Sequence, residues 1–379
     1  MRSSSYDLPG LPEPRMKNLE TSSSSRPRGL RVGLLNRGDP ATDGSSRVRA
    51  FQFAPHLESF GIQVRSLTWD SRSRASLLAY ALRAASLAAS SDIIWLQKPC
   101  QHPLFLRSLA SLNPRIVVDF DDAVWAPSTG CLRPGRSTRV SRTYGKRLVS
   151  ALRLARVVTP GNRYLARFAR RIAGEAVIQL LPSVVDLARY PLTPPRLHGS
   201  PITVGWVGSA GNHQDFNNDV RFALEELTVR GTVRLSVMSN QRPDFGFPFD
   251  FTRWSLDSEV HFLRRLDVGI MPLQNTPRAR GRCGFKALLY MASELPVVAS
   301  PVGAAFEVIE SRVSGLLARD AEDWIAALSS LAGNPEQRRT MGTAGRHRVE
   351  ARYSLNSALP TLVQILRGVA KSPRDLVSL

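Results

Sequence analysis

The chain has 379 residues, enough for one large domain or two medium-sized ones, and its 43% of hydrophobic residues can form a sizeable core. Its 51 Lys and Arg outnumber its 31 Asp and Glu, and the charge of +20 favours an anionic partner: a nucleic acid, an anionic membrane face or a phosphorylated ligand. Three widely spaced cysteines and six scattered histidines exclude a disulfide framework and a zinc module, and indicate a reducing compartment.

Residues 1–28 are rich in Ser, Pro and charged side chains and are predicted to form a disordered leader. They contain no apolar segment of the kind that a secretory signal needs. No stretch of the chain reaches the ~18 unbroken apolar residues that span a bilayer. A cytoplasmic location is therefore expected.

Short apolar runs then alternate with helical patterns over residues 29–190, the predicted N-terminal domain. Strands are expected at residues 30–35, 62–67, 92–97, 115–120, 156–159 and 176–181. Helical patterns of 10 to 18 residues lie between most of them. This alternation is typical of βαβ units in a parallel sheet.

Residues 191–201 contain four prolines and are predicted to be a linker, because neither a helix nor a central strand tolerates them. A second alternating set covers residues 202–354. Its expected strands are 202–207, 232–238, 267–272, 296–299 and 314–318, and its expected helices are 215–230, 284–293, 320–331 and 335–352. The pattern predicts an α/β protein with two Rossmann-like, doubly wound domains that face each other across a cleft. A further helix is expected at residues 355–367, within the C-terminal segment 355–379.

Most of the excess positive charge lies in the first half of the chain, where residues 1–195 hold 29 Lys and Arg against 13 Asp and Glu. A helical pattern over residues 136–156 has a basic face and an apolar face, and the next helix is also basic. The basic positions are Arg139, Arg142, Lys146 and Arg153, then Arg163, Arg167, Arg170 and Arg171. Two such helices suit contact with anionic lipid headgroups, although a solvated Arg-rich surface is the alternative. Nucleic acid is not expected, because no zinc finger, RNP-type strand or basic zipper is present.

A loop after the strand at 202–207 is a first candidate for phosphate binding. It contains Gly208, Ser209 and Asn212 and leads into a helix. Backbone N–H groups and the positive end of a helix at such a turn can hold a phosphate. Many α/β turns of this kind bind nothing, so the signal is weak on its own.

The segment RARGRCGFK, residues 278–286, is a stronger candidate. Its four cations are Arg278, Arg280, Arg282 and Lys286, and they flank Gly284 at the start of a predicted helix. The first turn of a helix normally favours acidic side chains, so cations there suggest a bound anion. A diphosphate would fit, and a solvated basic loop is the alternative.

Three carboxylates, Asp119, Asp121 and Asp122, end the strand at 115–120. They cannot all be buried without partners, so they are expected at the mouth of the first domain, facing the cleft, capping a helix or binding a cation. A metal site is not expected, because no further acidic group completes it. Ser46, Arg47 and Lys98 follow neighbouring strands and are assigned with Asp119 to an acceptor side. Ser46 and Arg47 could equally be a helix cap and a surface cation.

The stretch GRCGFKALLYMASELPVVASPVGAAFEVIESRVSGLLARDAEDW resembles the donor-binding region of the retaining glycosyltransferases called family 4. The order of SSRVRA, DIIWLQK, VVDFDDAVW, VVTPGNRYLA, VGWVGS, DVGIMPL and ARYSL agrees, so the likeness spans roughly residues 30–370. The resemblance implies the GT-B fold, with a nucleotide-sugar bound mainly by the second domain. It also implies that the final helix returns to the first domain.

One departure concerns the Glu-x7-Glu pattern of much of this family. The two positions fall on Gly281 and Leu289, and neither is a carboxylate. The sequence is similar to a branch with a basic loop, in which Arg282 and Lys286 would contact the diphosphate. Glu307, after the turn at Gly303, matches the acidic residue that the family places near the donor.

The resemblance implies a hexosyltransferase or related enzyme, expected in bacterial surface polysaccharide or glycolipid synthesis at the inner membrane face. The expected donor site comprises Gly208, Ser209, Asn212, Arg280, Arg282, Gly284, Lys286, Gly303 and Glu307. Arg282 and Lys286 would stabilise the leaving diphosphate, and Asp121 or Asp122 would act on the acceptor hydroxyl. No cofactor or metal is expected. A non-catalytic relative that only binds nucleotide-sugars and a basic nucleic-acid-binding protein are the alternatives.

Overall fold

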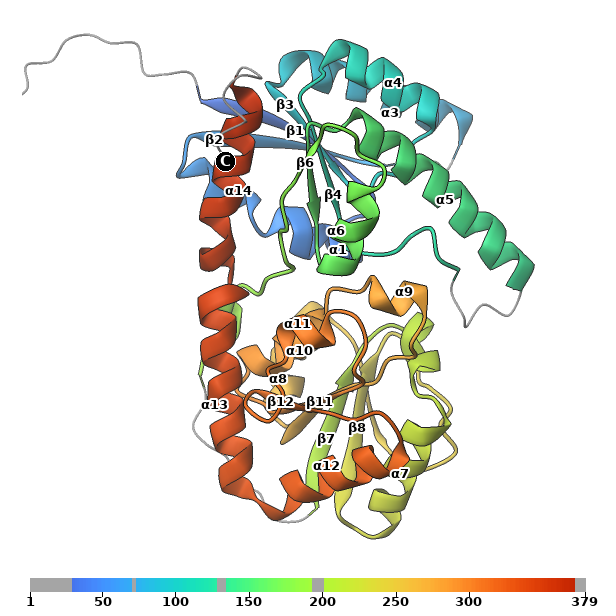
Figure 1. Ribbon diagram of the computed structural model, residues 1–379, viewed down its shortest axis with the longest axis vertical. Helices are drawn as coiled ribbons and strands as arrows, with labels where there is room; N and C mark the ends of the chain where they lie inside the picture. The colour runs from blue at the N-terminus through green and yellow to red at the C-terminus, as the bar shows by residue number, and fades with distance from the viewer. Residues whose placement is uncertain (1–28, 70–72, 128–133, 193–200, 372–379) are drawn as a thin grey trace, which may run out of the picture.

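The structure is a computed structural model that describes residues 29–69, 73–127, 134–192 and 201–371 (Figure 1). The predicted leader at 1–28 and most of the predicted linker at 191–201 lie outside the described residues. Two α/β units follow one another along the chain, as the strand–helix alternation predicts.

A six-stranded parallel sheet forms the centre of the N-terminal domain. Its strands are β1 (Leu30–Asn36), β2 (Ile62–Thr68), β3 (Ile93–Gln97), β4 (Ile116–Phe120), β5 (Val157–Pro160) and β6 (Val177–Ile178), in the order β2-β1-β3-β4-β5-β6. They are rich in Val, Ile and Leu because helices cover both faces. The register pairs Asn36 with Gln97 and Gln97 with Asp119, which gathers these polar residues at one sheet edge.

Two layers of helices cover this sheet. One face carries α3 (Arg74–Ser90), α4 (Pro103–Leu112), α5 (Pro134–Leu154) and α6 (Arg163–Arg170), whose buried side chains meet Leu35, Leu96 and Val118. The other face carries α1 (Gly44–Ser46), the π-helix η1 (Arg47–Phe51), α2 (Ala54–Glu58) and α14 (Leu355–Ala370). The last helix in the described part of the chain therefore completes the core of the first domain.

A second six-stranded parallel sheet forms the centre of the C-terminal domain. Its strands are β7 (Ile202–Val207), β8 (Val233–Ser239), β9 (Asp250–Arg253), β10 (Val268–Met271), β11 (Val297–Ala299) and β12 (Gly315–Leu317), in the order β12-β11-β10-β7-β8-β9. Helices α7 (Asn218–Val229) and α12 (Ala321–Gly333) cover one face. The other face carries α8 (Leu256–Leu263), α10 (Phe285–Ala292), α11 (Ala305–Val308) and α13 (Pro335–Arg352).

Several elements differ from the sequence expectations. Neither β9 nor α8 was predicted, and β9 is a polar edge strand, DFTR, that lacks an apolar run. The strand expected at 176–181 shrinks to Val177–Ile178 at the edge of the first sheet.

The chain crosses between the domains twice, and the two crossings lie side by side. The Val185 N–H donates to the Tyr353 carbonyl at 2.8 Å, and the Leu355 N–H donates to the Val185 carbonyl at 2.9 Å. Arg346 on α13 donates to the carbonyls of Tyr190 and Ala292 at 2.7 and 2.6 Å, which fastens the first crossing to the second domain. These bonds define one hinge region between the two sheets.

Candidate functional site

The start of α10 is the centre of the candidate site. Gly284 precedes the helix in the left-handed conformation, with φ of +70°, and provides no side-chain cap. Glycine suits this position because an L side chain is strained there. The first N–H groups of the helix are left to face a ligand or solvent, and its positive end favours an anion.

Two cations extend from this helix start. Arg282 forms an ion pair with Asp215, and Lys286 Nζ lies 5.4 Å from the centre of the Trp206 ring. Burial, with the nearby Arg282, lowers the pKa of Lys286 from 10.5 to about 8. A neighbouring anion would stabilise the charged form of Lys286 and raise its pKa again.

The Gly208 loop meets the same cations. A Cβ on Gly208 would lie 2.9 Å from Lys286 Cε and 2.5 Å from the Trp206 ring, so only glycine fits. After it, Ala210 N–H donates to Asn240 Oδ1 at 2.8 Å, and Asn212 Nδ2 donates to Ser209 Oγ at 3.3 Å. The loop continues into the short 3₁₀ helix η3 (Ala210–Asp215), which supplies the Asp215 partner of Arg282. The two phosphate-binding candidates thus form one basic corner of the second domain.

The loop before α10 packs directly against the first domain. Asn162 Nδ2 donates to the carbonyls of Arg280 and Arg282 at 3.2 and 3.0 Å, and the Cys283 thiol donates to the Asp121 carbonyl at 3.3 Å. A Cβ on Gly281 would lie 2.6 Å from the Ala123 backbone N. The cations therefore lie where the two domains meet, not on an outer wall.

The carboxylates of the first domain face the same contact. Lys98 Nζ lies 3.5 Å from both Asp121 and Asp122, and Arg278 donates to Asp122 Oδ2 at 3.0 Å. Although burial opposes ionisation, Lys98 holds the pKa of Asp121 below its usual value. The other oxygen of Asp122, Oδ1, is buried without a hydrogen-bond partner among the described residues. Arg278 belongs to the predicted basic loop, but its role in joining the domains was not predicted.

Two residues assigned to the acceptor side lie inside the first domain instead. Asp119 is fully buried, pairs with Arg49 at 2.5 Å and accepts from the Thr159 hydroxyl at 2.7 Å. Although burial opposes the charge, Asp119 raises the pKa of Arg49. Ser46 is also fully buried, and its hydroxyl lies 2.9 Å from Asp43 Oδ2 and 3.1 Å from Gln97 Oε1, either of which can accept its hydrogen. The expectation that both face an acceptor is wrong, because each side chain is buried and is hydrogen-bonded to other residues of the first domain.

Arg47 lies at the hinge side of the domain contact. Its guanidinium lies 5.5 Å from the centre of the Trp254 ring, across the domain boundary. With Tyr190, Glu259 and Phe285 it lines a cavity of about 50 Å³. The buried carboxylate of Glu259 accepts from the Tyr190 hydroxyl at 2.7 Å and from Trp254 Nε1 at 3.0 Å. This hinge network was not predicted from the sequence.

The remaining donor candidates lie around the same loop. Gly303, with φ of +56°, lets its turn approach the Arg280 carbonyl, since a Cβ would lie 2.7 Å from that oxygen. The exposed Arg280 side chain donates to Asn275 at 2.8 Å. Glu307 accepts from the Arg163 N–H of the first domain at 3.2 Å, and burial raises its pKa. Glu307 therefore bridges the two domains in this structure.

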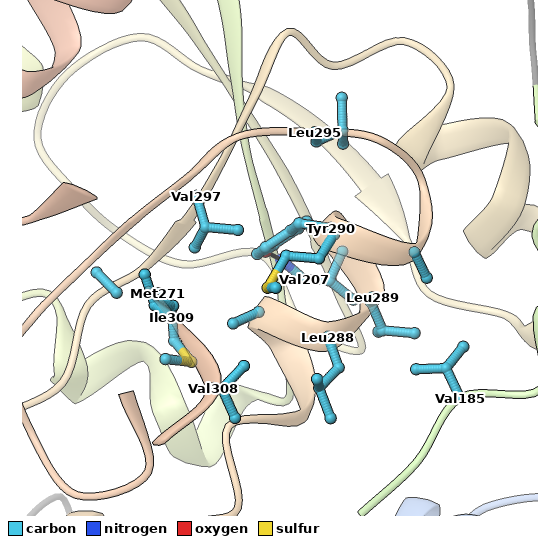
Figure 2. Close-up of a cluster of buried hydrophobic side chains, with 14 of the residues drawn as sticks. Val185, Val207, Met271, Leu288, Leu289, Tyr290, Leu295, Val297, Val308 and Ile309 are labelled. Atoms are coloured by element: carbon cyan, nitrogen blue, oxygen red, sulfur yellow. Dashed lines mark hydrogen bonds between the residues drawn. The ribbon is translucent and has the colours of Figure 1, made fainter. Parts of the chain in front are cut away.

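At the two positions where much of the family has the Glu pair, this chain has no residue that could replace a carboxylate. Gly281 has no room for a side chain against Ala123, and Leu289 is 3% exposed in the core of the second domain. Figure 2 shows Leu289 in this cluster, together with Val185, Leu288 and Tyr290. Within the described ranges, no group of three His, Cys, Asp or Glu could hold a metal ion. No helix in the described part of the chain is long and apolar enough to cross a membrane.

Comparison with known proteins places these features in a family context. Residues 207–334 match the family described as glycosyl transferases group 1. A D-inositol 3-phosphate glycosyltransferase of Saccharomonospora viridis is 34% identical over 110 residues, which are 28% of this chain and 24% of the relative. The aligned part thus spans about a quarter of that relative.

Solved structures resemble nearly the whole chain. The sucrose-phosphate synthase of Thermosynechococcus elongatus matches with a TM-score of 0.71 and 16% identity, over 89% of this chain and 98% of that one. HepE of Anabaena, solved in complex with UDP-glucose, matches with a TM-score of 0.66 and 14% identity, over 89% of this chain and 99% of that one. The chain therefore has the GT-B fold, and the domain that carries its basic corner is similar to the glycosyl transferases of group 1.

Proposed function

We propose that this protein is a retaining, family 4-type glycosyltransferase, which transfers a sugar from a nucleoside-diphosphate sugar to an acceptor hydroxyl. The observation that carries the proposal is the basic corner at the start of α10, where Arg282 and Lys286 adjoin the Gly208 turn at the domain contact. Such a corner suits a diphosphate, and the similar HepE structure contains UDP-glucose.

The chemistry follows from the charge that develops during transfer. Breaking the sugar–phosphate bond leaves growing negative charge on the nucleoside diphosphate. The barrier is lowered by Arg282, Lys286 and the positive end of α10, because their positive charge stabilises the negative charge on the leaving diphosphate. Asp121 or Asp122, held against the donor loop, orients or deprotonates the acceptor hydroxyl. Ser209, Asn212, Arg280 and Glu307 complete the donor side.

We assign the reaction to bacterial surface polysaccharide or glycolipid synthesis at the cytoplasmic face of the membrane, with a glycan or lipid-linked acceptor. The excess positive charge of the first half of the chain supports this location, since anionic lipid attracts it.

Binding of UDP, GDP, ADP and dTDP, measured by calorimetry on the full chain, tests the donor site. Arg282→Gln should weaken binding of the best nucleotide at least roughly tenfold, as expected for a lost charge-assisted bond. Arg265→Gln is the matched control, because that exposed cation lies outside the site. Equal affinity of the Arg282 variant and the wild type would refute the assignment.

The absence of carboxylates at Gly281 and Leu289 favours a second candidate, a GT-B protein that binds nucleotide-sugars without turnover. Binding of a nucleoside diphosphate together with no release of it from any UDP-, GDP-, ADP- or dTDP-sugar would support that candidate over the enzyme.

A further inference from the structure

We infer that the outer surface of α3, α4 and α5 docks the protein on an anionic lipid bilayer. This docking surface is made of exposed leucines on α3 and α4 and exposed cations on α5. It deepens the proposed function by naming the face that meets the membrane, but its argument rests on separate observations.

The apolar part of the docking surface lies on two adjacent helices. α3 buries Tyr80, Ala84 and Ala88 against the sheet and leaves Leu78 and Leu82 64% and 65% exposed. α4 likewise buries Leu106 and Leu109. Its exposed leucines are Leu104 and Leu112, at 63% and 52%. The Tyr80 and Phe105 rings, 5.9 Å apart, hold the two helices together at the level of Leu78, Leu82 and Leu104.

The exposed hydrophobic side chains of the described protein are concentrated on these helices. Of thirteen large hydrophobic side chains that are exposed in the described part of the chain, five lie on α3 and α4 and a sixth, Val140, lies on α5. Single exposed apolar residues are ordinary, whereas a group of them on neighbouring helices marks an interaction site.

The polar part of the docking surface has one sign of charge. Residues 123–174, which include α5 and α6, contain 12 Lys and Arg and no Asp or Glu, and α3 and α4 also lack acidic residues. Arg139, Arg142, Lys146 and Arg153 are exposed on α5, and none of them forms an ion pair with another described residue. These cations are therefore available to an anionic partner.

The combination favours a bilayer over other occupants. A second copy related by two-fold symmetry would place the same acid-free face against itself, and like charges would repel. Nucleic acid would neutralise the cations but would leave the leucines in water. An anionic bilayer satisfies both parts, because headgroup phosphates pair with cations while apolar side chains enter the acyl boundary.

The docking surface also lies beside the candidate site. The segment from Asp122 to Ala126 leads toward α5, and Arg278 of the donor loop donates to the Ala126 carbonyl at 3.3 Å. Figure 1 shows the start of α5 extending toward the second domain. A bilayer under α3–α5 would bring a lipid-linked acceptor close to the domain contact.

Co-sedimentation of the full chain with vesicles tests the docking surface. The wild type should bind phosphatidylglycerol-containing vesicles, and binding should weaken with salt and be absent on pure phosphatidylcholine. Leu78→Ser/Leu82→Ser/Leu104→Ser should lower the partition coefficient at least tenfold. Arg139→Gln/Arg142→Gln/Lys146→Gln should lower it similarly and flatten its salt dependence.

The matched control is Phe222→Ser/Val229→Ser on α7, which removes two side chains that are 56% and 79% exposed on the second domain. It should bind vesicles like the wild type. Vesicle binding that survives the leucine substitutions would overturn the inference. So would a wild-type dimer that these substitutions dissociate, or duplex DNA binding without any vesicle binding.

Calorimetry with UDP separates this inference from the proposed function. All three variants should bind UDP as the wild type does, because none of the substituted residues lies at the basic corner. Lost vesicle binding by the control as well as the leucine variant, with UDP affinity intact, would reject the docking surface alone. Wild-type vesicle binding without any nucleotide binding would reject the proposed function alone.

Discussion

Replacing Lys286 by Met should make the protein more stable while it weakens nucleoside diphosphate binding. In the folded protein, burial and Arg282 lower the pKa of Lys286 from 10.5 to about 8. Each pKa unit corresponds to about 1.4 kcal/mol, so the charged lysine costs the fold about 3 kcal/mol at neutral pH. Methionine keeps the apolar stem beside Trp206 and removes the charge.

The sign of the pH dependence follows from the same shift. Below about pH 8 Lys286 is charged in the folded and the unfolded chain, and the full cost is present. Between about 8 and 10.5 only the unfolded chain keeps the proton, so the free energy of unfolding rises with pH. The stability advantage of the Met variant should therefore be largest near neutral pH and should vanish above about pH 10.5.

Thermal unfolding of the full chain measures this. A gain of about 3 kcal/mol corresponds to roughly 6–12 °C in the melting temperature of a domain of this size. Lys146→Met, which replaces an exposed lysine on α5, should leave the melting temperature unchanged. A Lys286→Met variant that melts lower than the wild type, or that still binds UDP equally well, would show that the lysine is a structural residue.

Three other outcomes follow from the same contacts. UDP affinity of the wild type should fall roughly tenfold between about pH 7 and pH 9, as Lys286 loses its proton, and calorimetry should find no such slope in Lys286→Met. Arg49→Met should destabilise the protein by roughly 3–5 kcal/mol in denaturant unfolding, because the buried Asp119 carboxylate loses its partner. Gly281→Glu should lower both the melting temperature and UDP-sugar turnover, because its Cβ would lie 2.5 Å from Ala123 Cβ.

Each of these outcomes has a result that contradicts it. A pH slope shared by the Lys286 variant would assign the titration to another group. An Arg49 variant as stable as an Arg107→Met control, which changes an exposed cation on α4, would mean that Asp119 needs no partner. Higher turnover by Gly281→Glu would show that the donor loop can leave Ala123.

The sequence predicts the architecture well where apolar runs are long and both sheet faces are covered. The strands at 202–207 and 267–272, and the helix at 335–352, are close to β7, β10 and α13. β9 has no apolar run, so its pairing with β8 depends on tertiary contacts that a local pattern does not contain.

In the candidate site too, some features can be predicted from the local sequence and others depend on tertiary contacts. The basic loop and the Gly208 turn are recognisable locally, because cations at a helix start are unusual and a glycine turn after a strand is visible in the sequence. The burial of Ser46 and Asp119 cannot be recognised from the local sequence, because it depends on Arg49. This arginine lies in η1 and donates hydrogen bonds to Asp119 and to the Thr159 carbonyl. The signal available in the sequence was only Arg49 itself, a second cation two residues after Arg47 in the SSRVRA segment.

The return of α14 to the first sheet has a consequence for how the protein is made. The first domain is built mainly from residues 29–190, but α14 contributes four leucines to one face of its sheet: Leu355, Leu359, Leu362 and Leu366. A ribosome finishes the whole second domain before it supplies these side chains. During synthesis, the part of this apolar face that α14 covers therefore stays exposed until the second domain is complete. A fragment that ends near residue 190 should need a chaperone or should aggregate.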